Sequence, residues 1–166
     1  MPVMHDCHAH SAFPFAGYRC QRSGMPPNRI ADLQLRGDTS PLPVRVYWPG
    51  QAAPQPVPLL VFCVVGAGAE ASCRSLSEDL GLLVLAVSCP TGAQNGTTAL
   101  EWAAEHAAEL GGDPGRLLVA GQDAGSAIAA AVASQARAAG WPAVTLAAGQ
   151  NDAELFGAVQ KFTARN

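Results

Sequence analysis

Hydrophobic and polar side chains alternate in two early segments, Ile30–Arg36 and Pro43–Trp48, as they do in half-exposed strands. Turn-forming residues fill positions 37–41 between them, which predicts a β-hairpin. Continuous apolar runs follow, and such runs are typical of strands buried on both faces of a parallel sheet. These runs are Leu59–Val65, Leu82–Val87, Leu117–Ala120 and a weaker one at Ala143–Leu146.

Segments with helical character separate the apolar runs. They are Ala71–Leu80, Thr98–Leu110, Ala124–Ala139 and Glu154–Thr163. Thr98 and Glu101 have the spacing of a capping box, and the glycines and proline of 111–114 should end that helix. Strands that alternate with helices predict an α/β fold, namely a three-layer, mostly parallel sheet with an N-terminal antiparallel hairpin.

Length and composition fit one domain. The chain has 166 residues, of which 49% are hydrophobic, enough for a self-sufficient core. Residues 1–28 mix proline, glycine and single aromatics without a period, so we expect a poorly ordered arm there and a single domain over 29–166.

Charge and cysteine usage narrow the partners and the compartment. The net charge is −3 and Lys161 is the only lysine, so there is no basic surface for nucleic acid. No apolar run approaches the roughly 20 residues that span a bilayer, and the N-terminus lacks the pattern of a secretory signal. The five cysteines are an odd number without CxxC spacing, which favours reduced thiols and a cytoplasmic location. Cys63, Cys73 and Cys89 sit in apolar settings and are expected in the core, and Trp48, Trp102 and Trp141 are expected to be packing anchors.

The N-terminal segment His5-Asp6-Cys7-His8-Ala9-His10 resembles the D-x-H-x-H metal motif of amidohydrolases. No strand pattern surrounds it, and His106 is the only later histidine. We therefore expect a polar arm that binds zinc or nickel only adventitiously, no functional metal site and no cofactor.

The strand at 117–120 leads into Gly121-Gln122-Asp123-Ala124-Gly125 and then directly into a helix. A G-x-nucleophile-x-G turn at that place is the nucleophile elbow of α/β-hydrolases. Together with the preceding W-x-x-E-H-A-A-E-L-G-G-D-P-x-R at 102–116, it resembles the hormone-sensitive-lipase-like esterase branch of that superfamily. Pro43–Pro49 resembles an early strand of that branch and Pro58–Gly68 its oxyanion strand and loop, so the resemblance covers about 29–139.

Three departures from the family pattern bear on function. Asp123 stands where the family has the nucleophilic serine, and Val65-Gly66-Ala67-Gly68 stands where it has H-G-G-G. The family's acid and histidine follow later strands, but here no histidine follows His106, and Ser126 lies too far into the helix to replace the nucleophile. Serine needs a base within hydrogen-bond reach, so the resemblance implies a fold truncated at its C-terminal end without the esterase mechanism.

These departures leave several hypotheses open. The leading one is a catalytically impaired homologue that binds a small apolar ligand or a protein partner, near Gly66, Ala67, Gly68 and Ala124. The alternative is an enzyme that uses Asp123, by resemblance to epoxide hydrolases and haloalkane dehalogenases, or to serine-less dehydratases and cyclases. An open edge strand would also favour a homodimer, and a histidine of the arm (His5, His8 or His10) that approached Asp123 would restore a base.

A hypothesis of a different class concerns Gly66-Ala67-Gly68-Ala69-Glu70-Ala71, which has the G-x-G-x-x-A spacing of dinucleotide-binding turns. The fingerprint also needs an acidic residue at the end of the next strand, and that strand ends at Val87-Ser88-Cys89-Pro90. The same glycines are accounted for by the oxyanion loop of the resembled family.

Overall fold

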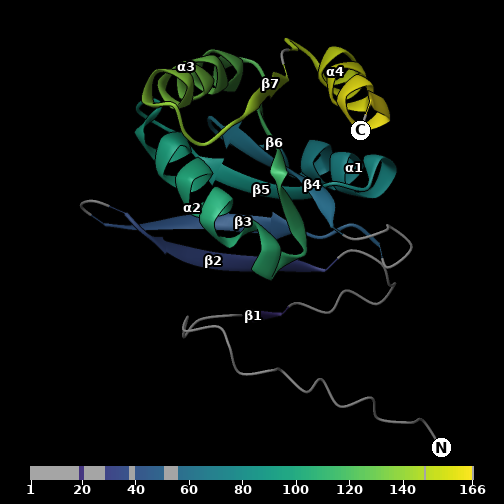
Figure 1. Ribbon diagram of the computed structural model, residues 1–166, viewed down its shortest axis with the longest axis horizontal. Helices are drawn as coiled ribbons and strands as arrows, with labels where there is room; N and C mark the ends of the chain where they lie inside the picture. The colour runs from purple at the N-terminus through teal and green to yellow at the C-terminus, as the bar shows by residue number, and fades with distance from the viewer. Residues whose placement is uncertain (1–18, 21–28, 38–39, 51–55, 148, 166) are drawn as a thin grey trace, which may run out of the picture.

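The computed structural model describes residues 19–20, 29–37, 40–50, 56–147 and 149–165, in which seven strands form one sheet in the order β1-β2-β3-β5-β4-β6-β7 (Figure 1). The strands are β1 (Arg19–Cys20), β2 (Ile30–Arg36), β3 (Pro41–Tyr47), β4 (Val57–Val64), β5 (Leu83–Ser88), β6 (Gly112–Gly121) and β7 (Thr145–Ala147). The helices are α1 (Glu70–Leu80), α2 (Gln94–Leu110), α3 (Ala124–Ala139) and α4 (Asp152–Arg165).

The sheet combines an antiparallel hairpin with a parallel part, as the sequence predicts. β2 and β3 pair from Ile30↔Tyr47 to Arg36↔Pro41, and β3 runs antiparallel to β5. β5, β4, β6 and β7 run parallel to one another. β4 therefore lies between β5 and β6, and the carboxyl ends of β4 and β6 meet where the strand order reverses, which is the usual place for a site in such sheets.

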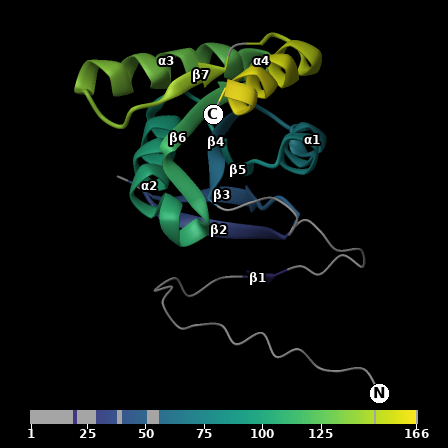
Figure 2. The ribbon, with the colours of Figure 1, turned by 45° about the vertical axis from the view of Figure 1, so that its right-hand side comes forward.

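Helices cover both faces of the sheet, so the predicted three-layer architecture is confirmed (Figures 1 and 2). α2 and α3 contact each other on one face, and α1 and α4 contact each other on the opposite face. β4 supplies side chains to both cores: Leu59, Val61 and Cys63 to the first, Leu60 and Phe62 to the second. A continuous apolar run is what a strand buried on both faces requires.

Helix α2 begins at Gln94, so the prediction of a capping box at Thr98 and Glu101 is wrong. Its first turn is held by tertiary contacts: Asn95 Nδ2 donates to the carbonyl oxygen of Ser88 at 2.9 Å, and Gly96 is packed against the core. Packing thus extends the helix past a glycine that intrinsic propensity disfavours. The helix ends as predicted, because Gly111 takes a left-handed conformation with φ 84°.

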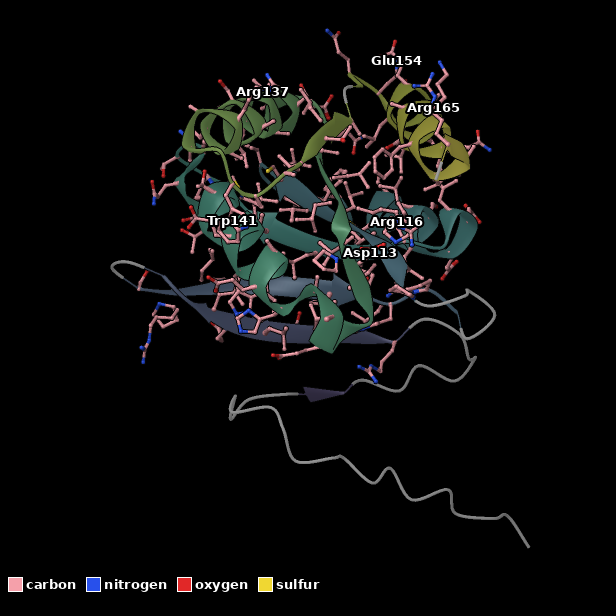
Figure 3. All side chains as sticks on the ribbon, in the orientation of Figure 1. Asp113, Arg116, Arg137, Trp141, Glu154 and Arg165 are labelled. Atoms are coloured by element: carbon pink, nitrogen blue, oxygen red, sulfur yellow. The ribbon has the colours of Figure 1, made fainter. Side chains whose placement is uncertain are left out.

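The tryptophans differ in their surroundings. Trp48 is 7% exposed, and its indole Nε1 donates to the carbonyl oxygen of Leu110 at 2.9 Å. Trp102 is half-buried against the core. Trp141 is 48% exposed, so the prediction that it anchors the core is wrong (Figure 3). It lies in the connection between α3 and β7, outside the layers.

Most of the predicted arm, 1–18 and 21–28, lies outside the described residues, and with it the histidine motif at 5–10. Within this segment Arg19–Cys20 pair with β2 as a short antiparallel strand. Among the helices that the structure describes, none has the length and apolar character needed to cross a bilayer.

Candidate functional site

The turn between β6 and α3 has the geometry of a nucleophile elbow. β6 ends at Gly121, α3 begins at Ala124, and Asp123 between them has φ 51° and ψ −122°. Asp123 is the only non-glycine residue with positive φ in the described part of the chain. Such a conformation costs about 1–3 kcal/mol and persists only where the surrounding structure imposes it.

Two glycines impose this conformation. A methyl group on Gly121 would overlap the backbone of Gly125, and one on Gly125 would overlap the carbonyl oxygen of Cys63 in β4. The N–H of Gly125 donates to the carbonyl oxygen of Gln122 at 2.8 Å, which closes the turn. The packing constraints of a nucleophile elbow are therefore intact, although its central residue is an aspartate.

The Asp123 side chain is exposed and does not cap α3. Its carboxylate makes no hydrogen bond or ion pair with any described residue. Ser126, the nearest serine along the chain, donates from Oγ to the carbonyl oxygen of Asp123 at 2.7 Å. Ser126 is thus bound to the backbone of the turn, in agreement with the expectation that it does not replace the nucleophile.

His106 lies in the last part of α2, near the end of the sheet at which β6 begins. The elbow lies at the other end of that ten-residue strand, so His106 cannot act as its base. The imidazole stacks on Trp102 with 4.5 Å between ring centroids, and its Nδ1 lies 2.9 Å from the carbonyl oxygen of Trp102. Among the described residues, no histidine approaches Asp123.

The loop after β4 opens beside the elbow. Gly66 has φ 80° and Gly68 has φ 105°, and open space lies where their Cβ atoms would be. The loop borders a hollow of about 590 Å³ that also reaches Tyr47 and Ser88. Residues 65–68 are exposed, so this loop is open to a ligand at the carboxyl end of β4.

Charged groups line the same hollow. Arg45 Nε lies 2.6 Å from Asp32 Oδ1, and Arg45 also approaches Glu70, which pairs with Arg74 at 2.8 Å. The bond to Arg74 lowers the pKa of Glu70, so this carboxylate is ionised at the N-terminal turn of α1. Arg45 and Arg74 are thus already paired with carboxylates and are not free to bind a phosphate, which counts against the dinucleotide hypothesis.

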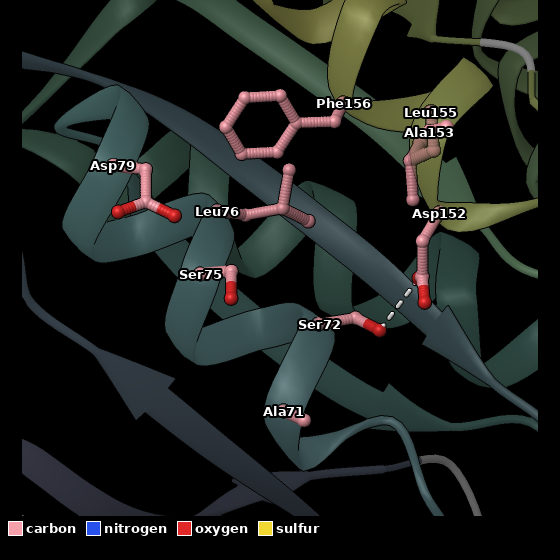
Figure 4. Close-up of a pocket in the computed structure, with 9 residues that line it drawn as sticks. All are labelled: Ala71, Ser72, Ser75, Leu76, Asp79, Asp152, Ala153, Leu155 and Phe156. Atoms are coloured by element: carbon pink, nitrogen blue, oxygen red, sulfur yellow. Dashed lines mark hydrogen bonds between the residues drawn. The ribbon is translucent and has the colours of Figure 1, made fainter.

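Three polar residues at the elbow were not found by sequence reasoning. Gln122 Nε2 donates to Asp152 Oδ1 at 2.8 Å, and Ser72 Oγ donates to the same oxygen at 2.8 Å (Figure 4). Ser72 Oγ also lies 3.3 Å from Gln122 Oε1. The network joins the elbow to α1 and to the first residue of α4, which are far apart in the sequence and carry no common motif.

An apolar groove of about 590 Å³ lies next to this network, between α1 and α4 (Figure 4). Alanine, leucine and phenylalanine make up five of its nine lining residues, and two serines and two aspartates are the others: Ala71, Ser72, Ser75, Leu76, Asp79, Asp152, Ala153, Leu155 and Phe156. The described residues hold no group of three or more histidine, cysteine, aspartate or glutamate side chains placed to bind a metal ion.

The G-G-D-P-x-R segment at 111–116 has a structural role at the start of β6, at the opposite end of that strand from the elbow. Asp113 Oδ2 lies 2.8 Å from Arg116 Nε, and Arg116 Nη2 donates to the carbonyl oxygen of Pro56 at 2.6 Å (Figure 3). The Gly115 N–H donates to the same carboxylate at 2.8 Å. The Arg116 guanidinium, with this N–H, lowers the pKa of Asp113.

Comparison with known proteins identifies the family. Residues 62–151 match a family described as the alpha/beta hydrolase fold. The chain belongs to this family. Esterase LipI of Mycobacterium tuberculosis is 30% identical over 135 residues, which cover 72% of this chain and 42% of LipI. Carboxylesterase NlhH of the same organism is 31% identical over 145 residues, which cover 75% of this chain and 45% of NlhH.

Solved structures give the same result for this α/β-hydrolase. Esterase LipW of Mycobacterium marinum superposes with a TM-score of 0.62 at 31% identity, covering 72% of this chain and 43% of LipW. An esterase of Pyrobaculum calidifontis gives a TM-score of 0.62 at 28% identity, covering 70% and 43%. The resemblance to the esterase branch is thereby confirmed, and the chain spans less than half the length of each of these relatives.

Proposed function

We propose that this α/β-hydrolase is catalytically impaired as an esterase and acts by binding a small apolar ligand or a protein partner. The observation that carries the proposal is Asp123, which occupies the nucleophile position while no histidine of the described residues comes near. Ester hydrolysis by this fold needs a hydroxyl and a base that takes its proton. In the described part of the chain the nucleophile position carries no hydroxyl, and no histidine lies near it.

The groove between α1 and α4 supports a small apolar ligand. About 590 Å³ lies within the usual range of ligand pockets, and its walls are mainly apolar. The polar network of Ser72 and Asp152 borders one end of the groove, next to the elbow. A ligand there would contact both helices that cover this face of the sheet.

Two measurements test this proposal. Hydrolysis of p-nitrophenyl butyrate should be absent in the unvaried protein and in Asp123→Ser, because a serine without a base is a weak nucleophile. Turnover by Asp123→Ser would overturn the claim of impairment. For binding, N-phenyl-1-naphthylamine should gain fluorescence with the unvaried protein and lose most of that gain with Phe156→Ala. Phe162→Ala, from the same helix but outside the groove, is the control, and equal losses in both variants would contradict the site.

A second function is favoured by the free carboxylate of Asp123, since a carboxylate attacks carbon without a base. It would open an epoxide or displace a halide, and a histidine-activated water would then be needed to hydrolyse the ester formed. Incubation with styrene oxide or 1-bromobutane followed by intact-mass measurement tests this. A stoichiometric adduct that Asp123→Ala abolishes would support it, and an unchanged mass would contradict it. Dehydratase or cyclase activity through Asp123 remains a hypothesis.

The remaining expectations are proposals with simple tests. Nucleotide binding through Gly66–Gly68 predicts a thermal shift with NAD or NADP. A homodimer that pairs edge strands predicts twice the chain mass in sedimentation equilibrium. A cytoplasmic location is supported by the free thiols of Cys63, Cys73 and Cys89, and fractionation of expressing cells would test it. The proposed single domain over 29–166 predicts one cooperative unfolding transition.

A further inference from the structure

Two cysteines lie side by side in the core beneath the site. Cys63 is in β4, where it pairs with Val87 of β5 and Gly121 of β6. Cys89 follows the end of β5, and its N–H donates to the carbonyl oxygen of Val64 at 2.8 Å. Both side chains are fully buried, and both belong to the core on the α2 and α3 face.

The two sulfur atoms converge on one point of α2. A Cβ on Gly96 would lie 3.2 Å from Cys63 Sγ and 3.6 Å from Cys89 Sγ. The Cys89 thiol donates to the carbonyl oxygen of Val87, with 3.7 Å between sulfur and oxygen. The two thiols are therefore neighbours in the core, and the absence of a side chain at Gly96 allows α2 to approach both.

The pKa values of the two thiols shift in opposite directions. Donation to Cys89 and burial raise the pKa of Cys63. The pKa of Cys89 is lowered because its sulfur accepts from Cys63 and from the backbone of Gly96. Since the thiolate is the reactive form of cysteine, Cys89 is the partner that attacks and Cys63 the one that resolves.

We propose that Cys63 and Cys89 are a modification site, a buried thiol pair that a small hydroperoxide converts to a disulfide. The Cys89 thiolate attacks one peroxide oxygen, the O–O bond breaks, and hydroxide or alkoxide leaves to give a sulfenic acid. The Cys63 thiol then attacks that sulfur, the S–O bond breaks, and its proton leaves with the hydroxide as water. Two thiols lose two electrons and two protons, and the peroxide is reduced to water and water or alcohol.

The position of the pair connects it to the site above. Cys63 is two residues before the exposed loop that begins at Val65, and its carbonyl oxygen is in close contact with Gly125 of the elbow. Cys89 begins the connection from β5 to α2. A disulfide would join the ends of β4 and β5 directly beneath the elbow, whatever the activity of the site.

Cys73 is an internal control. It is as fully buried as the pair, but it lies in α1 in the core on the other face. Burial raises its pKa to about 12. If access of peroxide alone decided which thiol reacts, Cys73 would be oxidised as readily as Cys63 and Cys89. If a neighbouring thiol is required, the pair is oxidised and Cys73 stays reduced.

The experiment uses the full chain in a Cys7→Ser, Cys20→Ser background, which leaves these three cysteines. After hydrogen peroxide treatment, the protein is denatured, alkylated with N-ethylmaleimide and measured by intact mass and peptide mapping. We expect two thiols to escape alkylation, to return after phosphine reduction, and to map as one Cys63–Cys89 crosslink. Cys73→Ser should keep the crosslink, and Cys63→Ser should lose it.

The opposite results are equally specific. Three alkylated thiols at a peroxide dose that fully oxidises glutathione would overturn the proposal, as would a crosslink that includes Cys73. If Cys63→Ser does not fold, the peptide map of the background protein decides the question alone. A crosslink that forms only after denaturation would also overturn it, so alkylation is repeated on protein unfolded before the peroxide is added.

Discussion

The carbonyl oxygen of Cys63, at the end of the central strand β4, is so close to Gly125 that no side chain fits between them. This contact brings the first turn of α3 onto the sheet. It fixes where the chain must reverse after β6, and so it determines the strained backbone of Asp123. The shape of the elbow thus depends on one backbone contact between strand and helix.

Gly125→Ala should therefore destabilise the fold strongly, by about 3 kcal/mol, because the added methyl group meets backbone that cannot move aside. Gly157→Ala in α4 is the matched control, since nothing lies within 4 Å of its Cβ position. That substitution should stabilise the protein by about 0.5–1 kcal/mol through helix propensity and chain entropy. Urea unfolding measures both, and similar values for the two variants would contradict the contact.

Asp123→Gly should be more stable than Asp123→Ala by about 1 kcal/mol. Both variants remove the carboxylate, but only glycine adopts φ 51° without strain. Ala130→Gly, at an exposed position inside α3, should instead destabilise, as glycine does within a helix. Melting temperatures of the three variants check this. An alanine variant as stable as the glycine variant would mean that the elbow is not strained.

The sequence predicts the fold well because the hydrophobic pattern follows the sheet closely. The run predicted at 59–65 is buried on both faces from 59 to 63, whereas Val65 lies beyond the strand and is 39% exposed. The alternating run at 30–36 forms a strand of those bounds. The predicted start of α2 is wrong, because packing of Gly96 against two cysteines outweighs the capping signal at Thr98. The elbow was predictable because Gly121, Asp123 and Gly125 lie within five consecutive residues.

The rest of the site was not predictable from the sequence, for a physical reason. Ser72, Gln122 and Asp152 come from three elements and meet only because α1 and α4 share one face of the sheet. None of them belongs to a local pattern. The proximity of Cys63 and Cys89 likewise depends on the register of β4 with β5, which places Cys63 opposite Val87 and which sequence periodicity does not give.

Asp152→Ala should loosen α4. The carboxylate accepts from Gln122 and Ser72 through one oxygen, so its removal leaves both donors without this partner and costs about 1–2 kcal/mol. Hydrogen exchange should accelerate in α4 and little in α3. Ser75→Ala, in the same groove but outside the network, is the control and should leave exchange unchanged. Equal exchange in both variants would show that the network does not hold the helix.

Tyr47→Phe should remove part of the loss of stability at alkaline pH. Tyr47 is 2% exposed, and burial raises the pKa of its hydroxyl from 10.0 to about 12. Between these values the unfolded chain ionises this group while the folded chain does not, so the free energy of unfolding falls as pH rises from 10 to 12. Below pH 10 the contribution is fully present.

Urea unfolding at pH 8, 10, 11 and 12 should show a smaller decline for Tyr47→Phe than for the unvaried protein. Burial also raises the pKa of the Cys73 thiol, from 9.0 to about 12, so this thiol contributes its own part of the decline. Measuring Cys73→Ala alongside separates that part from the part due to Tyr47. Identical declines for Tyr47→Phe and the unvaried protein would show that the hydroxyl does not titrate from a buried position.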